Sequence, residues 1–295
     1  MRNRATGFVL MSTMFFALMN VCIKLLPGIP SYEIVLFRSV ISFILSLTLL
    51  LRLRIFPFGK GNYFYLIMRG IAGSAALLIY FYTLQHLPLA TAVTVQYLSP
   101  LFTVLFAAFL LKEKLRWQQW IFLLLSFAGV VLIKGFGNDF PVSLLLLGML
   151  SAALTGFAYN AVRKAGETEH ALVVVFYLPL VTIPVITPFA VNNWVMPSGN
   201  EWLLLIAVGL LTQIAQVYQT RAYQIEMASR VTPYTFLGIV FAIIFGIFIF
   251  HEHYALTGYL GMIIVMTGVV LNFFFLNRLT SLRRLQAYLR HFPGG

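Results

Sequence analysis

Ten long apolar stretches follow one another through almost the whole chain, and each has about the ~20 residues that an α-helix needs to cross a bilayer. Short breaks rich in proline, glycine and polar residues separate them, and no break is long enough to form a soluble domain. Only 9% of the 295 residues are charged, against about 25% in soluble domains. The sequence therefore predicts an all-α polytopic membrane protein with ten transmembrane helices. Their expected limits are 7–26, 32–51, 63–85, 88–111, 117–134, 142–163, 171–190, 201–223, 231–250 and 255–277.

The net charge of +12 raises the alternative of a nucleic-acid-binding protein, but most of the basic residues lie between the apolar stretches. Membrane topology explains that placement, because cytoplasmic loops carry an excess of lysine and arginine. With the N-terminus inside, sixteen basic residues fall on one side of the membrane, and only Lys24 and Lys134 fall on the other. We therefore expect a multi-pass protein of the inner (plasma) membrane, in contact with the lipid bilayer and not with nucleic acid, with both termini in the cytoplasm.

The sequence lacks the residue patterns of enzymes and metal sites. Cys22 is the single cysteine, which excludes an internal disulfide and a Cys-rich metal site. His251 and His253 flank Glu252 without the His-Glu-x-x-His spacing of a zinc hydrolase, and no Gly-x-Ser-x-Gly elbow or phosphate-binding loop occurs. We expect no catalytic residue, no metal and no cofactor, and hence a protein that is not an enzyme.

The stretch 87–133 recurs at 226–272, shifted by 139 positions without a gap. Nine of the 47 positions are identical, and the first five fall at helical spacing and end on an acidic pair, Glu113 and Glu252. Shared apolar composition is the alternative explanation. Because five spans separate the two glutamates, duplicated halves would cross the membrane in opposite directions, as in many secondary transporters. The predicted organisation is two inverted five-helix repeats and a basic cytoplasmic tail. Their limits are 1–140, 141–277 and 278–295.

Several short motifs occur along the chain in a fixed order. They are Asn20-x-x-x-Lys24, Phe37-Arg38, Arg69-Gly70, Ser99-Pro100, Leu111-Lys112-Glu113-Lys114-Leu115 and Gly129-Val130-Val131-Leu132, with Phe250-His251-Glu252 and Gly268-Val269-Val270-Leu271 in the second half. In this combination the chain resembles the drug/metabolite transporter superfamily, specifically its EamA-type ten-helix members. The resemblance implies a metabolite carrier with a central cavity and with the fifth and tenth helices at the periphery. The chain looks most like members that take up S-adenosylmethionine. One departure is that Gly238-Ile239 replaces Ser99-Pro100 in the second copy, so an exactly symmetric site is not expected.

Two spans carry unusual polar residues. Arg38 lies within the second helix, where a charge costs at least ~2.5 kcal/mol, so it either contacts substrate or pairs structurally with Glu33. Arg69 lies nearer the cytoplasmic surface and is interpreted as an anchor. Gln213, Gln216 and Gln219 share one face of the eighth helix, which suits either a cavity lining or interhelical hydrogen bonds.

Aromatic and amide side chains in other spans complete the candidate site, since a ring can stack on a flat or cationic ligand while its hydroxyl orients it. Some of these tyrosines would instead serve packing or the membrane interface. The predicted substrate-binding residues are Asn20, Arg38, Tyr80, Tyr82, Gln96, Tyr97, Tyr159, Asn160, Tyr177, Gln213, Gln216 and Tyr234.

The sequence thus favours a secondary transporter that moves a small polar metabolite by alternating access. The metabolite is expected to resemble an amino acid or a nucleotide, with S-adenosylmethionine as one example. All eight acidic residues lie at helix ends or in loops, which favours facilitated transport or exchange of a neutral, zwitterionic or anionic solute. A flippase of a lipid-linked sugar and a non-transporting membrane partner protein remain as alternatives. The sequence leaves the oligomeric state open between a monomer and a homodimer.

Overall fold

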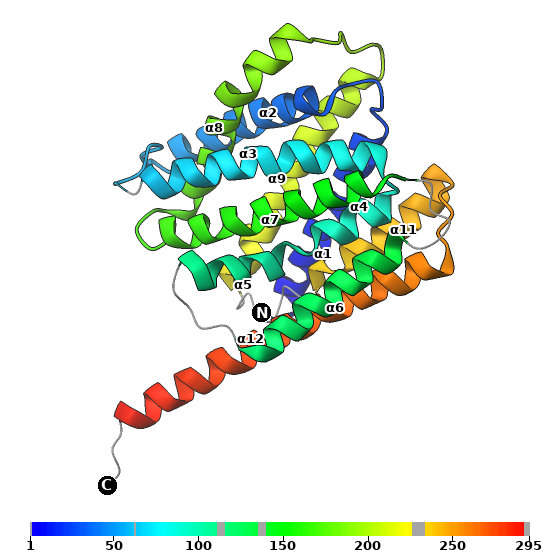
Figure 1. Cartoon of the computed structure of the whole chain (residues 1–295). Coiled ribbons are helices and arrows are strands. Elements are labelled where there is room, and N and C mark those ends of the chain that lie inside the picture. Colours follow the sequence, from blue (N-terminus) through cyan, green and yellow to red (C-terminus); the bar gives the residue numbers. More distant parts are fainter. Residues whose placement is uncertain (1, 62, 111–115, 135–139, 226–233, 292–295) are drawn as a thin grey trace.

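The computed structural model describes residues 2–61, 63–110, 116–134, 140–225 and 234–291, and all regular secondary structure in them is helical (Figure 1). Nine segments of this described part are long and apolar enough to cross a membrane, and α11 is a further, shorter apolar helix. The predicted all-helical polytopic fold is confirmed. The helices are α1 (Arg2–Lys24), α2 (Ser31–Arg52), α3 (Tyr63–His86), α4 (Leu89–Gln96), α5 (Ser99–Leu110), α6 (Trp117–Lys134), α7 (Val142–Ala165), α8 (Ala171–Asn192), α9 (Glu201–Ile225), α11 (Leu237–Phe250) and α12 (Leu256–His291).

The largest departure from the predicted limits is at the end of the chain. The last span was expected to end at 277, but α12 continues as one helix to His291 and projects beyond the rest of the bundle (Figure 1). The motif Leu111-Lys112-Glu113-Lys114-Leu115 lies outside the described residues.

The predicted fourth span is divided into two helices, α4 and α5. Pro100 lacks a backbone N–H, so it cannot donate to the carbonyl of Gln96 four residues earlier, and α4 ends at that residue. The short connection through Tyr97 and Leu98 keeps turn-like bonds, with Leu98 N donating to Val95 O at 3.0 Å. The break places Tyr97 and Leu98 in a bend inside the bundle, with Ser99 as the first residue of α5.

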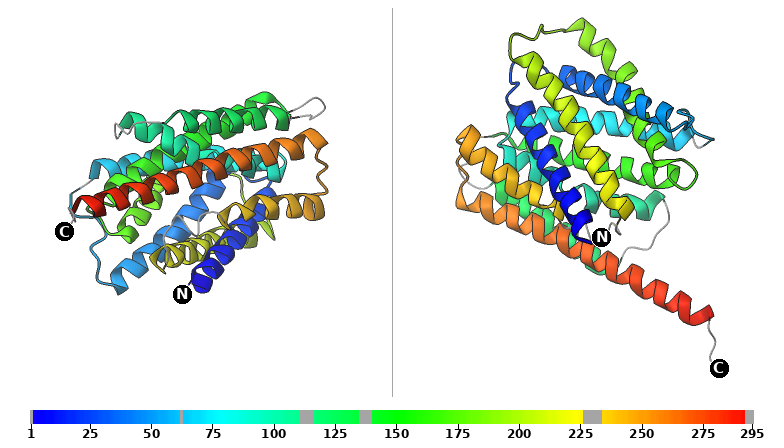
Figure 2. Two further views of the ribbon diagram at one scale, coloured as in Figure 1. Left: turned by 90° about the horizontal axis from the view of Figure 1, so that it is seen from below. Right: turned by 180° about the vertical axis from the view of Figure 1, so that it is seen from behind.

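The helices pair in a pattern with approximate twofold symmetry. Helix α1, the first span, packs on α9, the eighth. Helix α7, the sixth span, packs on α3, the third. Each pair is the counterpart of the other, because spans one and six, and spans three and eight, are five spans apart. Figure 1 shows α3 and α7 side by side, and the right-hand view of Figure 2 shows the same for α1 (blue) and α9 (yellow-green). The pairs α2–α8, α4–α11 and α6–α12 map onto themselves. This pairing places spans from both halves around one centre.

Helices α6 and α12 meet along one edge of the bundle through very close backbone contacts. A Cβ atom at Gly129 would lie 2.8 Å from Gly261 O, and one at Gly261 would lie 2.5 Å from Gly129 O. Small residues allow such approach between membrane helices, where packing rather than water exclusion drives association. Glycine is therefore required at both positions by contact distance.

We expect Gly129→Ala to lower the melting temperature of the purified protein by about 5 °C, because overpacking costs about 1–3 kcal/mol. The added methyl group would press on the backbone of α12, which cannot retreat without separating the two helices. Gly7→Ala is the matched control, since a Cβ atom there meets no atom within 4 Å. Equal melting temperatures for the two variants would contradict the proposed close packing.

Candidate functional site

A cavity of about 550 Å³ lies inside the bundle, within the usual size range of small-molecule sites. Helices α1, α2, α3, α4, α5, α7, α8, α9 and α11 contribute lining residues, whereas no residue of α6 or α12 in the described part does so. The cavity thus lies on the pseudo-twofold centre of the bundle, between the two halves of the chain. Its wall is mixed, with aromatic rings beside amides, hydroxyls and two arginines.

Two of the lining side chains are held in place by neighbouring helices. Gln96 donates from Nε2 to Thr155 Oγ1 at 3.0 Å and accepts at Oε1 from Ser151 Oγ at 3.0 Å, so α7 fixes its amide. The Tyr97 hydroxyl donates to Thr235 O at 2.5 Å. A Cβ atom at position 238 would lie 2.5 Å from that hydroxyl oxygen. Glycine rather than a second serine therefore stands at this position of the second repeat.

The remaining polar wall comes from helices that face one another across the cavity. Asn20 of α1 is 7% exposed, and Gln216 and Gln219 of α9 lie one helical turn apart on the same side. Arg38 of α2 and Arg69 of α3 complete this wall. Hydrogen-bond donors therefore surround a space that Tyr80 and Phe236 border with aromatic rings.

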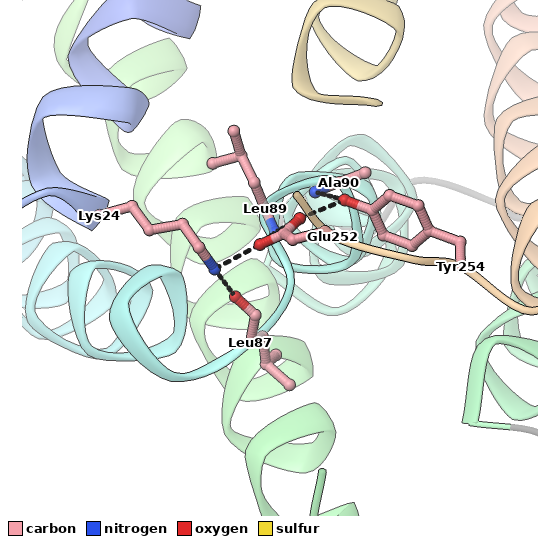
Figure 3. Close-up of polar contacts among 6 residues, drawn as sticks. All are labelled: Lys24, Leu87, Leu89, Ala90, Glu252 and Tyr254. Atoms are coloured by element: carbon pink, nitrogen blue, oxygen red, sulfur yellow. Dashed lines mark hydrogen bonds and ion pairs between the residues drawn. The ribbon is translucent and has the colours of Figure 1, made fainter. Parts of the chain in front are cut away.

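A cluster around Glu252 joins three helices at the end of the bundle where α1 and α11 end and α4 begins (Figure 3). The Glu252 carboxylate accepts hydrogen bonds from Leu89 N at 3.0 and 2.9 Å and pairs with Lys24 Nζ at 2.7 Å. The Tyr254 hydroxyl donates to the same carboxylate and accepts from Ala90 N. The carboxylate thus caps the N-terminus of α4, where negative charge is favoured.

The local sequence explains how Glu252 reaches α4. His251 adopts a left-handed conformation, with φ of 53°, directly after α11 and reverses the chain. The Glu252 N–H then donates back to Gly246 O at 2.9 Å. A Cβ atom at Gly246 would lie 2.6 Å from Glu252 Oε2, so glycine makes room for the carboxylate. The side chains of Lys24 and Glu252 are only 14% and 11% exposed.

Burial and the hydrogen bond to the Glu252 carboxylate raise the pKa of Tyr254. The phenol therefore stays protonated at neutral pH and keeps donating to the carboxylate. Lys24 also donates to Leu87 O, so the cluster fixes the turn between α3 and α4 as well. The cluster closes this end of the bundle, about one helical turn beyond Asn20 and the cavity.

The model of the EamA-like transporter family matches the chain twice, over residues 4–135 and 142–274. The chain belongs to the EamA-like transporter family. The resemblance in the sequence motifs is thereby confirmed, and with it a membrane transporter of a small metabolite rather than an enzyme.

Two relatives of this EamA protein are named as transporters of different solutes, pseudopaline and S-adenosylmethionine. The pseudopaline exporter of Pseudomonas aeruginosa is 33% identical over 87% of this chain and 92% of its own length. The S-adenosylmethionine uptake transporter of Rickettsia prowazekii is 29% identical over 75% and 76%, and mouse solute carrier family 35 member G1 is 28% identical over 90% and 77%. A solved crystal structure, 20% identical, aligns with a TM-score of 0.64 over 95% of this chain and 99% of that one, which shows a shared fold.

The structure of this EamA chain brings seven of the twelve predicted site residues to the central cavity. Whether they bind substrate remains a prediction, but their position is compatible with it. These seven are Asn20, Arg38, Tyr80, Gln96, Tyr97, Tyr159 and Gln216.

The other five predicted residues lie elsewhere, and three of them have other contacts. The Tyr82 ring contacts the His86 ring at a tilt of 32°, in a separate surface groove of about 720 Å³ near the Glu252 cluster. Asn160 donates to Thr103 O and Gly156 O and ties α7 to α5. The Tyr177 hydroxyl donates to Phe58 O.

The last two, Gln213 and Tyr234, do not line the cavity. Asn20 and Asn160 occupy equivalent positions in the predicted repeats, yet of the two only Asn20 lines the cavity. A repeated residue need not have a repeated role, because the two halves pack differently around it.

Sequence reasoning missed several residues of the cavity wall. Arg69 was interpreted as an anchor near the cytoplasmic surface, but it lines the cavity. Gln219 was noticed as part of the polar face of α9 but not selected, and Ser12, Thr13 and Thr155 gave no signal because short hydroxyls are common in membrane helices. The sequence offered one usable signal for these residues, which is that Arg69 is a charged residue within a predicted span.

Proposed function

We propose that this chain is a secondary transporter that moves a small polar metabolite across the inner membrane by alternating access. The observation that carries the proposal is a cavity between the two halves of the chain that is lined by polar groups, with the Lys24–Glu252 cluster beyond one end of it. The solute binds in that cavity, where it contacts Asn20, Arg38 and Gln216.

The inverted five-helix repeat supplies the mechanism. The twofold pairing of the spans supports repeats at 1–140 and 141–277 that cross the membrane in opposite directions, since five spans separate equivalent positions. With both termini in the cytoplasm, as the loop charges favour, Lys24 and Glu252 lie at the outer face. The cavity then lies on the cytoplasmic side of the Lys24–Glu252 cluster. Outward opening requires the Lys24–Glu252 contact to break.

No aspartate or glutamate among the described residues lines the cavity. A cation exporter driven by protons uses a carboxylate that exchanges a proton for the cation. We therefore favour facilitated transport or exchange, with an amino-acid-like or nucleotide-like solute. Relatives named for pseudopaline export and S-adenosylmethionine uptake are compatible with solutes of this size.

The test is exchange in proteoliposomes. Vesicles with purified protein are loaded with a pool of small polar metabolites, and solutes that leave in exchange for the same pool outside are identified by mass spectrometry. We expect saturable exchange that needs no pH gradient. A strict requirement for a pH gradient would contradict the mechanism, and movement of a lipid-linked sugar without exchange of soluble metabolites would instead support a flippase.

A further inference from the structure

Two arginines from neighbouring helices line the central cavity. Arg38 lies in α2 and Arg69 in α3, and these are the only charged side chains that line the cavity in the part of the chain that the structure describes. Arg38 is 5% exposed, so its charge is almost fully removed from bulk water. Both residues come from the first repeat, which makes the cavity electrically asymmetric.

No described residue compensates either arginine through a hydrogen bond or an ion pair. Within the described residues, neither has a hydrogen bond or an ion pair, and Nε of Arg38 and Nε and Nη1 of Arg69 are buried without a partner. Glu33 precedes Arg38 by five residues, but its Oε1 accepts from Val195 N at 2.7 Å and it forms no ion pair. The structural alternative suggested by the sequence, a pair between Arg38 and Glu33, is therefore not present.

The placement is electrostatically unfavourable for the empty protein. Buried charges are ordinarily paired, because an uncompensated charge in a low-dielectric interior loses its hydration without gaining a partner. The two guanidinium groups also line the same cavity, and like charges in a low-dielectric interior repel one another. An arginine whose role is purely structural would donate to backbone carbonyls or a carboxylate, and these two do not. Among the described residues no carboxylate lines the cavity, so an anion bound there would supply the missing negative charge.

We propose that Arg38 and Arg69 together bind a carboxylate group of the transported solute. This assignment rests on the proposed function and adds the chemical class of the substrate. A guanidinium group presents N–H donors in a planar fork that matches the two oxygens of a carboxylate, and two such groups compensate one anion strongly. The amides of Gln216 and Gln219 line the same cavity and can bind the rest of the solute. The solute is thus an organic acid or amino acid that carries further polar groups.

The experiment measures the melting temperature of the full-length protein in detergent with two matched pools. The first contains L-glutamate, L-aspartate and succinate, and the second contains L-glutamine, L-asparagine and succinamide, with sodium chloride added to equal ionic strength. We expect the carboxylate pool to raise the melting temperature by about 3 °C or more at saturating concentration. The amide pool should have no comparable effect, because an amide cannot neutralise the two charges.

Arg38→Gln and Arg69→Gln are each expected to weaken carboxylate binding by about 10-fold or more. Arg52→Gln is the control on α2, since Arg52 is exposed and lies outside the cavity. Without solute, both cavity variants should melt at or above the temperature of the unmodified protein, because each removes an uncompensated charge. A lower melting temperature for the empty variants would indicate structural arginines and would overturn the proposal, as would equal or absent stabilisation by the carboxylate pool.

A lipid phosphate could offer the same oxyanion chemistry, so the measurement is repeated with phosphatidylglycerol and with phosphatidylcholine added to the detergent. Stabilisation by phosphatidylglycerol that disappears in Arg38→Gln, without any effect of the carboxylate pool, would assign the arginines to a lipid headgroup and overturn the solute proposal. Exchange of neutral metabolites in proteoliposomes, again without a carboxylate effect, would leave the transport function standing and reject only the assigned substrate class. Absence of exchange for every solute would reject the transport function itself.

Discussion

Replacing Glu252 by alanine is expected to destabilise the protein by about 3–5 kcal/mol, because it leaves a nearly buried lysine without its partner. The same change removes the acceptor for Leu89 N at the start of α4 and for the Tyr254 hydroxyl. The melting temperature of the purified protein should fall by about 10 °C. Lys24→Met should be milder, since Leu89 N and the Tyr254 hydroxyl would still bind the carboxylate.

A double-mutant cycle distinguishes the energy of the Lys24–Glu252 interaction from nonspecific destabilisation by the two substitutions. Because Lys24 and Glu252 are in direct contact, the double variant should lose less stability than the sum of the single variants, with a coupling of about 2 kcal/mol. Glu167→Ala is the matched control, since Glu167 pairs with Lys164 at 3.2 Å but its side chain is 59% exposed. Exposed pairs contribute about 1 kcal/mol or less. If Glu252→Ala were as mild as Glu167→Ala, the cluster would not hold this end of the bundle together.

The cluster also bears on transport. It connects α1, α4 and α11, which belong to both halves of the chain, and it lies beyond the cavity, about one helical turn from Asn20. A carrier that alternates must break such a contact in each cycle, so its strength sets the balance between the two open forms. Glu252→Ala should therefore favour the outward-open form. Increased labelling of the cavity from outside by a membrane-impermeant reagent would show that shift.

The second large effect is expected from the amide face of α9. Gln216→Leu with Gln219→Leu should reduce solute exchange in proteoliposomes by at least about 10-fold, because leucine keeps the volume of each side chain but removes its hydrogen bonds to the solute. Both residues line the cavity, so the loss should occur with little change in melting temperature. The comparison of exchange rate with melting temperature distinguishes a binding role from a structural one.

Gln118→Leu is the control for the α9 variant, since Gln118 lies in α6, which contributes nothing to the cavity in the described part. Its exchange rate should equal that of the unmodified protein. Gln213→Leu provides a further comparison, because the sequence selected Gln213 whereas the structure places Gln219 at the cavity. A loss of exchange with Gln213→Leu but not with Gln219→Leu would contradict the site as the structure shows it.

The difference between Gln213 and Gln219 illustrates how precisely helical periodicity predicts which residues line a cavity. Residues 213, 216 and 219 are three apart, and each step of three residues in a helix turns by about 300°, so the three side chains drift around the axis. A stripe in the sequence therefore defines a broad polar face but not its centre. The packing of α1 and α2 against α9 decides which part of that face remains beside the cavity.

The sequence by itself determined the membrane location, the all-helical fold, the order of the spans and the family. These depend on local properties: the length of each apolar stretch, the placement of proline and glycine, and motifs within single spans. Only the tertiary structure decided that Arg69 joins Arg38 at the cavity, that Asn160 does not follow Asn20 there, and that Lys24 meets Glu252. Each of these facts depends on which helices cross and at what depth, and those relations arise from packing between segments that are far apart in the chain.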